Sequence, residues 1–512
     1  MARTAALALA FLALMAGPAQ ATTFEVVVVP GFGLDDLERA QELGAVGLLN
    51  PGAGPETSRA LALNSLVRGE ARNSLRGDPA DGLLLRVSPT TGALGSVPGP
   101  AIYVGLPEGG RQPNDRRYPI LVAAPGYEGV LTSQSTRIPG IVSIADVAPT
   151  ALGREDALGS EPAADPAGEL LALDARIRAN NETRLAATLL VCALVLLLAV
   201  VAPAAAVPGL AAALTANVAL GLAGASERWA VLVVLGLAVA LGGPLLARLL
   251  RGPLALGVAL AGVLLLHLVA LALDGPAVAL SPFGPTQNAR YFGLSNLLGT
   301  FLLVPALGAA ALLRRHLGWP AFGAVALVAF AVVAGNRFGA DGGGAIVLAV
   351  GFAVLAVLLA GGSRRALAAA VAAGLVLALG LVALDTATGA SSHVTRALEG
   401  GPRELAGDLA ERVELSWRRA TDGPGIALVV AGLLAAFACL VGLALGKLPP
   451  GGARAVPIAL AAAIAASLVA NDSPVDVLLV GSVGFAAASV GMLGARWPAF
   501  SSSPSPPSRS SS

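Results

Sequence analysis

The segment Ser281–Asn296 reads SPFGPTQNARYFGLSN and leads into a long apolar run. A polar group inside a lipid bilayer is costly unless it has a partner, so polar groups at membrane depth are usually functional. The segment is therefore the first candidate for a binding site. Its candidate residues are Gln287, Asn288, Arg290, Tyr291 and Asn296.

The composition is that of a membrane protein with many spans. Of the 512 residues, 55% are hydrophobic and only 13% are charged, and the mean hydropathy is +0.76. Soluble globular domains carry about twice that charged fraction. No basic patch is large enough for nucleic acid. The two cysteines, Cys192 and Cys439, both lie within apolar runs, so no disulfide framework is implied.

Apolar runs of roughly 17 to 25 residues predict the helices that span the membrane. Eleven such runs follow residue 184, and only the break at 203–208 separates the first two. The predicted spans are Leu185–Val201, Val207–Gly224, Ala230–Leu246, Leu254–Leu273, Phe292–Leu313, Pro320–Ala334, Ala345–Ala360, Ala366–Leu384, Gly425–Leu445, Val456–Ala470 and Val475–Leu493.

The N-terminus is typical of a secretory signal, with Arg3 before an apolar core and small residues at Ala19 and Ala21. Cleavage after Ala21 is expected, and an uncleaved anchor is the alternative. The predicted organisation is a signal peptide (1–21), an α/β ectodomain (22–153), a helical juxtamembrane linker (154–184), a membrane domain (185–494) with an outer loop at 385–424, and a disordered tail (495–512).

Basic residues predict the orientation, because loops on the cytoplasmic side are enriched in Lys and Arg. We therefore expect a multi-pass cell-membrane protein with an extracytoplasmic ectodomain and a cytoplasmic C-terminus. The basic residues expected to face the cytoplasm are Arg248, Arg251, Arg314, Arg315, Arg364, Arg365, Lys447, Arg454 and Arg496.

The same orientation places four polar segments together on the outer side. They are Ser281–Asn296, Gly335–Gly344 (GNRFGADGGG), residues 385–424, and Asn471–Pro474 (NDSP). We predict that they form one ligand site, and ordinary solvated loop ends are the alternative. Beyond the five residues above, the site would include Asn336, Arg337, Asp341, Arg418, Arg419, Asn471 and Asp472.

The charges of this predicted site favour an anionic ligand. An arginine at membrane depth needs a carboxylate partner or an anion. Asp341 and Asp472 are the carboxylates expected within reach, and they are too few to neutralise all the arginines. Arginine binds phosphate in a bidentate manner that lysine cannot match. The arginines concerned are Arg290, Arg337, Arg418 and Arg419.

The outer loop predicts an amphipathic helix after Pro402. Apolar Leu405, Leu409, Val413 and Trp417 recur at helical spacing, with charged residues on the other faces. Such a helix would lie at the membrane interface with its tryptophan at headgroup depth. A lid packed on the bundle is the alternative.

The region before the first span predicts a small domain of alternating strands and helices. The β-branched run Phe24–Val29 predicts a buried parallel strand, followed by a helix at Leu34–Leu43. Further helices are predicted at Thr57–Val67 and Gly168–Arg184. Further strands are predicted at Ala45–Leu49, Gly82–Val87, Ala101–Gly105, Ile120–Ala124 and Ile141–Ile144.

Three stretches of this domain, VVVVPGFGLDDL (26–37), ERAQELGAVGLLN (38–50) and IVSIADVAPTALG (141–153), resemble the alkaline phosphatase superfamily. The D-x-x-P-T motif that begins at Asp146 is the most specific part. The resemblance implies two metal ions, usually zinc, held by Asp and His. It also implies a Ser or Thr nucleophile at a helix N-terminus.

The sequence departs from that pattern at the metal ligands. Pro30 stands where the first Asp is expected, and all three histidines, His267, His316 and His393, lie outside the domain. Thr57 and Ser58 stand near the nucleophile position, but residues that begin a helix are more simply explained as caps. We therefore predict a shortened, degenerate phosphatase fold with no catalytic activity, metal or other cofactor.

Residues 286–422 resemble, more distantly, the O-antigen ligase and polymerase group of membrane glycosyltransferases. The resemblance rests on R-x-F-G-x-x-N at one span, N-R two spans later, and a long outer loop. It implies that Arg290, Arg337 and one of Arg418 or Arg419 hold the diphosphate of a polyprenyl-linked glycan. His393 or Asp341 would then act as the base.

Two functions stay open. One is a cell-envelope protein that acts on a membrane lipid or a polyprenyl-phosphate-linked substrate, alone or with envelope-assembly proteins. The other is a transporter or a lipid-handling scaffold, in which Gly342–Gly344 would form a hinge or a close helix contact. The halves of the chain show no internal symmetry of the inverted-repeat kind, which favours the first function.

Overall fold

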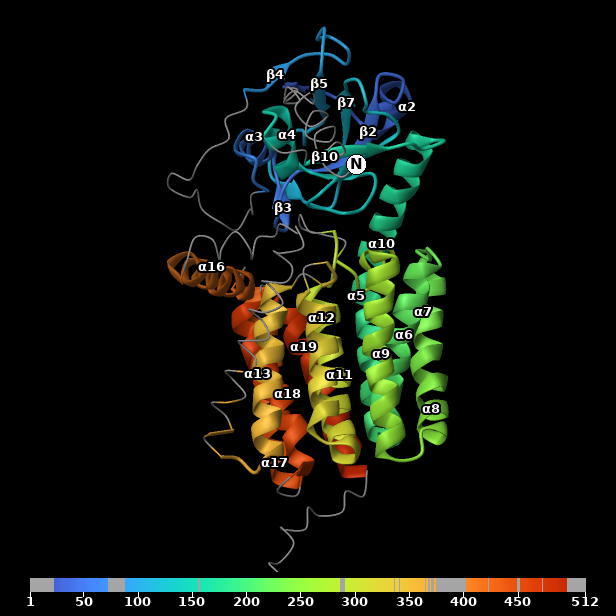
Figure 1. Ribbon diagram of the computed structural model, residues 1–512, viewed down its shortest axis with the longest axis vertical. Coiled ribbons are helices and arrows are strands. Elements are labelled where there is room, and N and C mark those ends of the chain that lie inside the picture. The colour runs from blue at the N-terminus through green and yellow to red at the C-terminus, as the bar shows by residue number, and fades with distance from the viewer. Residues whose placement is uncertain are drawn as a thin grey trace, which may run out of the picture. The chain divides into compact units, whose positions relative to one another are not determined.

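The computed structural model divides the chain into two compact units, Met1–Asp174 and Ala175–Ser512. The first contains a β-sheet with short helices, and the second consists mainly of long helices (Figure 1). The structure describes residues 23–71, 88–154, 157–285, 291–335, 337–339, 341–363, 365–366, 369, 373, 402–421, 423–448, 452–471 and 473–494.

A mixed β-sheet forms the centre of the first unit, as the alternation of strands and helices predicts. Within the described residues its order is β10-β8-β2-β7-β5-β1-β4, with β9 also pairing with β2. β1 pairs in parallel with β4 and β5, and every residue of β2 is buried. The strands are β1 (Glu25–Val28), β2 (Ala45–Asn50), β4 (Thr90–Thr91), β5 (Ala101–Val104), β7 (Tyr118–Ala123), β8 (Val130–Ser133), β9 (Ile141–Ser143) and β10 (Leu158–Glu161).

Short helices pack on this sheet through an apolar core that includes Leu66, Ile102, Leu131 and Val147. A separate two-stranded sheet pairs β3 with β6. These remaining elements are η1 (Leu34–Asp36), α2 (Leu37–Ala40), β3 (Glu56–Thr57), α3 (Arg59–Arg68), β6 (Gln112–Pro113), η2 (Ile144–Asp146) and α4 (Val147–Ala151).

Most predicted strands of this unit are confirmed, as β1, β2, β5, β7 and β9. The predicted strand Gly82–Val87 lies outside the described residues. The longer strands that the sequence analysis does not predict are β8 and β10, which pair with each other. Each has only four residues and includes polar ones such as Ser133 and Ser160, so neither forms an apolar run.

The second unit is built of apolar helices. Within the described residues, eight helices are long and apolar enough to cross a membrane, and α12 and α18 are shorter apolar helices. The helices are α5 (Pro166–Val201), α6 (Pro203–Leu222), α7 (Arg228–Leu237) continued by η3 (Ala238–Gly242) and α8 (Gly243–Leu249), α9 (Pro253–Leu273), α10 (Gly275–Ala279), α11 (Asn296–Leu317), α12 (Trp319–Ala334), α13 (Gly342–Leu359), α16 (Pro402–Ala420), α17 (Pro424–Lys447), α18 (Gly452–Ala470) and α19 (Pro474–Gly494).

Ten predicted spans overlap one of these helices, and Ala366–Leu384 lies almost wholly outside the described residues. One boundary differs, because α5 is a single helix. The predicted linker 154–184 therefore does not end before the first span, and its helix continues into that span. No Gly or Pro interrupts residues 169–201, which explains the continuity.

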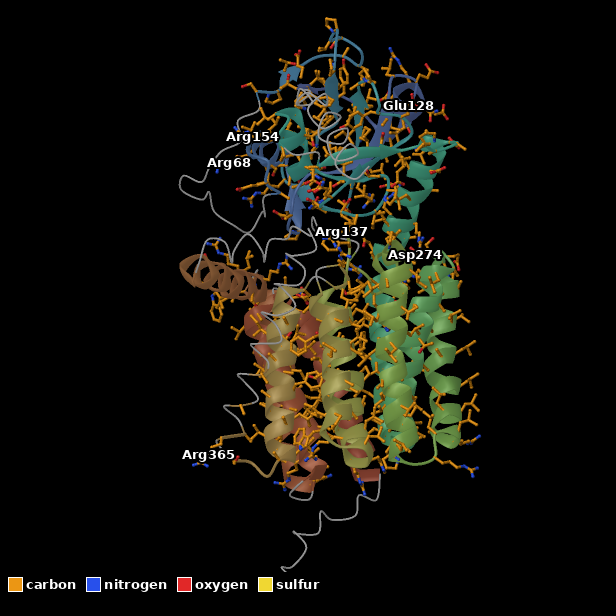
Figure 2. The ribbon with its side chains drawn as sticks, in the orientation of Figure 1. Arg68, Glu128, Arg137, Arg154, Asp274 and Arg365 are labelled. Carbon is orange, nitrogen blue, oxygen red and sulfur yellow. The ribbon has the colours of Figure 1, made fainter. Side chains whose placement is uncertain are left out.

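The helical unit has two chemically different ends. Figure 2 shows Asp274 and Arg365 at opposite ends of the bundle. We call the end that carries Asp274 the polar end, which comprises the described residues within 274–296, 335–342 and 470–474. The opposite, basic end carries Arg248, Arg251, Arg314, Arg315, Lys447 and Arg454. There Arg314 donates from Nη2 to the Leu359 carbonyl at 2.9 Å and so joins α11 to α13.

Candidate functional site

A polar stripe on α5 holds the beginning of the 281–296 segment. Arg176, Asn180 and Arg184 are four residues apart and so share one helix face. Arg176 donates to the Gly221 carbonyl at 2.8 Å, and Asn180 donates to the Leu280 carbonyl at 2.7 Å. Arg184 donates to the carbonyls of Pro282 and Gly284. The stripe thus binds carbonyls at the end of α6 and in the segment that follows α10.

Asn217, fully buried in α6, fixes the same segment from another side. Its Nδ2 donates to Ser281 Oγ at 3.0 Å, and its Oδ1 accepts from the backbone N–H of Phe283 at 3.0 Å. Ser295 closes the segment by donating to the Phe283 carbonyl at 2.5 Å while it caps α11. The predicted residues Gln287, Asn288 and Arg290 lie outside the described residues, and Tyr291 is buried.

Two of the predicted polar segments touch through their backbones. Gly293 has a left-handed φ of 77°, and the neighbouring Leu294 N–H donates to the Gly339 carbonyl at 3.2 Å. A Cβ atom on Gly293 would overlap that carbonyl, so only glycine fits this close approach. The turn between α12 and α13 is therefore packed directly against the start of α11.

The third polar segment joins the same place. Asn296 Nδ2 donates to Ser473 Oγ at 3.3 Å, and Asn471 Nδ2 donates to Ser467 Oγ at 2.8 Å. A Cβ atom on Gly343 would overlap Asn471 Oδ1, which places the end of α18 against the start of α13. Three of the four segments that the sequence groups together thus converge at the polar end. Asp472 lies outside the described residues.

A small cavity lies where these segments meet, among α11, α12, α13 and α18. Its volume is about 10 Å³, which is room for roughly one water molecule. The polar residues of its wall are Asn296, Thr300, Asp341, Ser467 and Asn471, and Leu303, Val333, Val347 and Leu348 form its apolar part.

Asp341 is the charged residue of this wall, and only 4% of it is exposed. Its backbone N–H donates to the Val333 carbonyl at 2.9 Å, and its carbonyl accepts from Ala345 in the first turn of α13. Its carboxylate makes no hydrogen bond or ion pair with any residue that the structure describes, and it does not cap α13 with its side chain. A buried carboxylate in this state is unusual, because burial without a partner is costly.

Arg337, four positions before Asp341, differs from it in exposure. Arg337 is exposed on the turn, and within the described chain no ion pair joins it to Asp341. Asp341 is buried and Arg337 is exposed, so the two residues lie in different surroundings although they are close in sequence. Asn336 lies outside the described residues.

The amphipathic helix predicted in the outer loop is present as α16, which packs on α18. Ser416 donates to the Leu468 carbonyl at 2.9 Å, whereas 69% of Trp417 is exposed. Arg418 forms an exposed ion pair with Glu414 at 2.5 Å. Arg419 is half-buried, and His393 lies outside the described residues.

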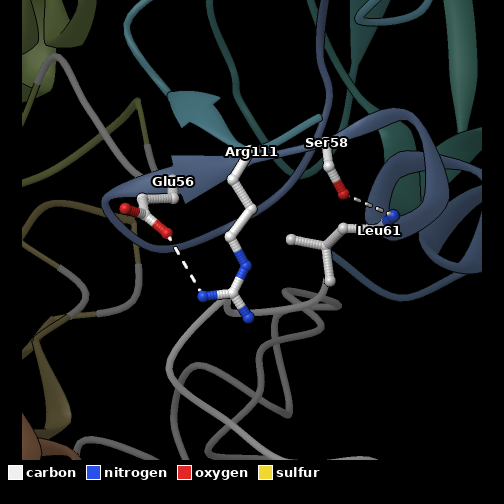
Figure 3. Close-up of polar contacts among 4 residues, drawn as sticks. All are labelled: Glu56, Ser58, Leu61 and Arg111. Atoms are coloured by element: carbon white, nitrogen blue, oxygen red, sulfur yellow. Dashed lines mark hydrogen bonds and ion pairs between the residues drawn. The ribbon is translucent and has the colours of Figure 1, made fainter. Parts of the chain in front are cut away.

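In the first unit, the predicted capping role of Ser58 is confirmed. Its Oγ accepts from the Leu61 N–H at 3.2 Å at the start of α3, as Figure 3 shows. The same view shows the exposed ion pair between Glu56 and Arg111, whose atoms are 3.7 Å apart. Thr57 is buried, and its hydroxyl has no hydrogen-bond partner within the described residues.

The other phosphatase-like positions are structural or solvent-facing. The Asp146 carboxylate accepts hydrogen bonds from the Ser133 hydroxyl and from the backbone and hydroxyl of Ser135, so it ties η2 to the segment after β8. Pro30 lines an open depression of about 500 Å³ together with Asp36 and Arg39. No three His, Cys, Asp or Glu side chains within the described residues are placed to share a metal ion.

Burial raises the pKa of Tyr118, in strand β7, above its ordinary value, and the charge of Arg116 opposes this shift. The hydroxyl is therefore neutral at physiological pH, and it accepts a hydrogen bond from Gln112 Nε2 at 2.9 Å.

Two site residues that the sequence analysis does not predict are Thr300 and Ser467. Each lies one helical turn inside an apolar span from a predicted residue, Asn296 or Asn471. That spacing of four was available as a signal, because such residues lie on the same helix face. The α5 stripe is also absent from the prediction, although its members share the same spacing.

Comparison of this chain with protein-family models, with curated proteins and with solved structures finds no match.

Proposed function

We propose that this protein is an integral membrane protein of the cell envelope that binds a lipid-linked phosphate or glycan at the polar end of its helix bundle. The observation that supports this most is the convergence of three polar segments at one end of the bundle, where helix α16 packs on α18. The exposed guanidinium of Arg337 lies on the turn between α12 and α13, where a phosphate headgroup could reach it.

We further propose that the polar end faces outward and that the basic end faces the cytoplasm. The supporting observation is the separation of charge between the ends of the bundle. The described Arg and Lys residues of the basic end lie at or near helix ends, as expected for cytoplasmic loops. Asp341 lies at the other end of the bundle. In this proposal the phosphatase-like first unit is extracytoplasmic and does not catalyse a reaction.

A photoactivatable polyprenyl diphosphate in proteoliposomes tests the lipid proposal. We expect saturable labelling of peptides from the polar end, and competition by unlabelled polyprenyl phosphate but not by diacylglycerol. Arg337→Lys should reduce labelling at least about tenfold, since Lys cannot grip a diphosphate with two parallel bonds. The matched control Arg251→Lys, at the basic end, should leave labelling unchanged.

Unselective labelling, or equal labelling of Arg337→Lys and Arg251→Lys, would contradict the proposed lipid site. Arg290→Lys should behave like Arg337→Lys, although Arg290 lies outside the described residues. Both variants should insert into the membrane and unfold near the wild-type temperature, because each keeps the positive charge and Arg337 is exposed.

A transporter is the second candidate, and the unpaired carboxylate of Asp341 favours it. Ionisable residues inside a span commonly mark ion or proton pathways. Conversion of the lipid substrate by purified protein in detergent would indicate an enzyme. Substrate movement across sealed liposomes without chemical change would indicate a transporter.

A further inference from the structure

The cavity beside Asp341 contains a negative charge that a lipid substrate would not neutralise. The cavity holds roughly one water-sized particle, far less than a phosphate group. Yet it contains a carboxylate that makes no hydrogen bond or ion pair within the described chain. We propose that this cavity binds one monovalent cation of the size of Na⁺, held by Asp341, Thr300, Ser467 and Asn471.

The donor atoms fit a hard cation. Thr300 gives its hydroxyl proton to the Asn296 carbonyl at 2.7 Å, which leaves the oxygen lone pairs for a ligand. Asn471 gives an Nδ2 proton to Ser467 Oγ at 2.8 Å, so its other end is the Oδ1 acceptor. The wall therefore presents oxygen atoms, which suit alkali and alkaline-earth ions better than the soft transition metals.

The number of charges selects a monovalent ion. Within the described wall, Asp341 supplies one negative charge and the remaining polar groups are neutral. One monovalent cation would neutralise it, whereas a divalent ion would leave an uncompensated positive charge in an apolar surrounding. Mg²⁺ would in addition keep several of its water ligands, for which this cavity has no room.

The position of Asp341 in the fold also suits a carboxylate that holds a cation. Asp341 is the N-cap residue of α13, an 18-residue helix whose N-terminal dipole favours a negative charge. Glycine at 344 leaves the space open, because a Cβ atom there would lie 2.6 Å from Asp341 Oδ2. Gly344 thus serves the cavity, and Gly343 serves the close contact with α18.

Thermal unfolding of the full chain in detergent at pH 8 tests the proposal. Na⁺ replacing choline at constant ionic strength should raise the unfolding temperature in a saturable manner, by roughly several degrees. Asp341→Asn should abolish this dependence. Thr300→Val should raise the half-saturating Na⁺ concentration about fivefold or more. The matched control Thr215→Val removes a hydroxyl that bonds only to Ala211 in its own helix, and it should behave like the wild type.

Binding of ²²Na⁺ to the wild type, Thr300→Val and Thr215→Val gives a second measurement that does not depend on the folding of Asp341→Asn. About one ion per wild-type chain is expected, with weaker binding only in Thr300→Val. Stability that follows pH but not Na⁺ would show that a proton occupies the site and would overturn the proposal. Equal effects of the two threonine variants, or a stronger response to Mg²⁺ than to Na⁺, would also overturn it. None of these measurements requires a lipid substrate, so this proposal stands or falls separately from the proposed function.

Discussion

Asn217 is a single side chain on which the shape of the polar end depends. It is fully buried within an apolar helix, yet both ends of its amide are used, one as a donor to Ser281 and one as an acceptor from Phe283. A polar residue at such a position normally costs stability, and here two hydrogen bonds to one loop offset that cost. Asn217 therefore fixes where the 281–296 segment begins.

Replacing Asn217 by Ala should lower the free energy of unfolding by roughly 2 to 4 kcal/mol, because it leaves two buried partners unsatisfied. Thermal or denaturant unfolding in detergent measures this. Thr215→Val, on the same helix, should cost less than about 1 kcal/mol. A loss no larger than that of the control would show that water replaces the amide and that Asn217 does not hold the loop.

At this scale the sequence predicts polar residues better than it predicts their partners. Asn296, Asp341 and Asn471 are all predicted from their place at the ends of apolar runs, and the structure brings them to one cavity. Thr300 and Ser467 are not predicted, because a hydroxyl in a span often bonds only to its own helix.

Helix α16 is polar in composition, and it packs on the bundle through one face. Leu415 and Ser416 are buried, whereas Val413 and Trp417 are exposed. The apolar spacing predicts the helix, and the structure adds that α18 supports it through Ser416. An interfacial position of Trp417 follows from this arrangement.

A protein that retains only Trp417, with Trp229, Trp319 and Trp497 changed to Phe, should show fluorescence quenched by lipids brominated near the headgroup. Lipids brominated near the chain end should quench it less, since an interfacial helix buries its apolar face only about 5 to 10 Å deep. A control that retains only Trp319 reports a tryptophan at the basic end. Strong quenching of Trp417 by acrylamide alone would place α16 in water.

In helix α5, the sequence predicts a boundary that the structure does not have. The predicted span begins at residue 185, where the apolar run begins. Hydropathy shows which residues suit a membrane, but it does not show where a helix begins. The backbone has no reason to stop there, since residues with good helix propensity continue on both sides. Strands β8 and β10 are missed for a related reason, because their stability comes from pairing with each other and not from an apolar pattern.

For the whole molecule, the two chemically different ends predict a sidedness that can be measured. In a background with Cys192 and Cys439 changed to Ala, single cysteines at positions 342 and 473 should react with an impermeant thiol reagent added to intact cells. A cysteine at position 363, at the basic end, should react only after the cells are opened. Labelling of position 363 alone in intact cells would reverse the orientation.

The first unit should bind no stoichiometric zinc and should not hydrolyse aryl phosphates. The reason is that Pro30 stands at an expected ligand position, while the carboxylate of Asp146 is occupied by Ser133 and Ser135. Metal analysis of the purified protein and an aryl phosphate assay measure the two properties. About two zinc ions per chain would contradict this prediction.

The sequence is sufficient to predict the class of the whole molecule, an α/β unit followed by apolar helices, because hydrophobic periodicity and run length determine both. It also predicts that three of the polar segments belong together, since their alternation along the chain follows from counting spans. It cannot predict the cavity, which depends on side-chain packing among four helices that are far apart in sequence.

The polar stripe of α5 has a consequence for the order of biosynthesis, which concerns Asn180 and Arg184 most, because Arg176 also binds the earlier Gly221 carbonyl. Arg176, Asn180 and Arg184 leave the ribosome about a hundred residues before the carbonyls of Leu280, Pro282 and Gly284 that they bind. Domains and helices of a nascent chain begin to fold N-terminal end first. Until residue 284 has been made, Asn180 and Arg184 must stay hydrated or be shielded by the insertion machinery. The first span of this protein can therefore settle at its final depth only after four later helices have been synthesised.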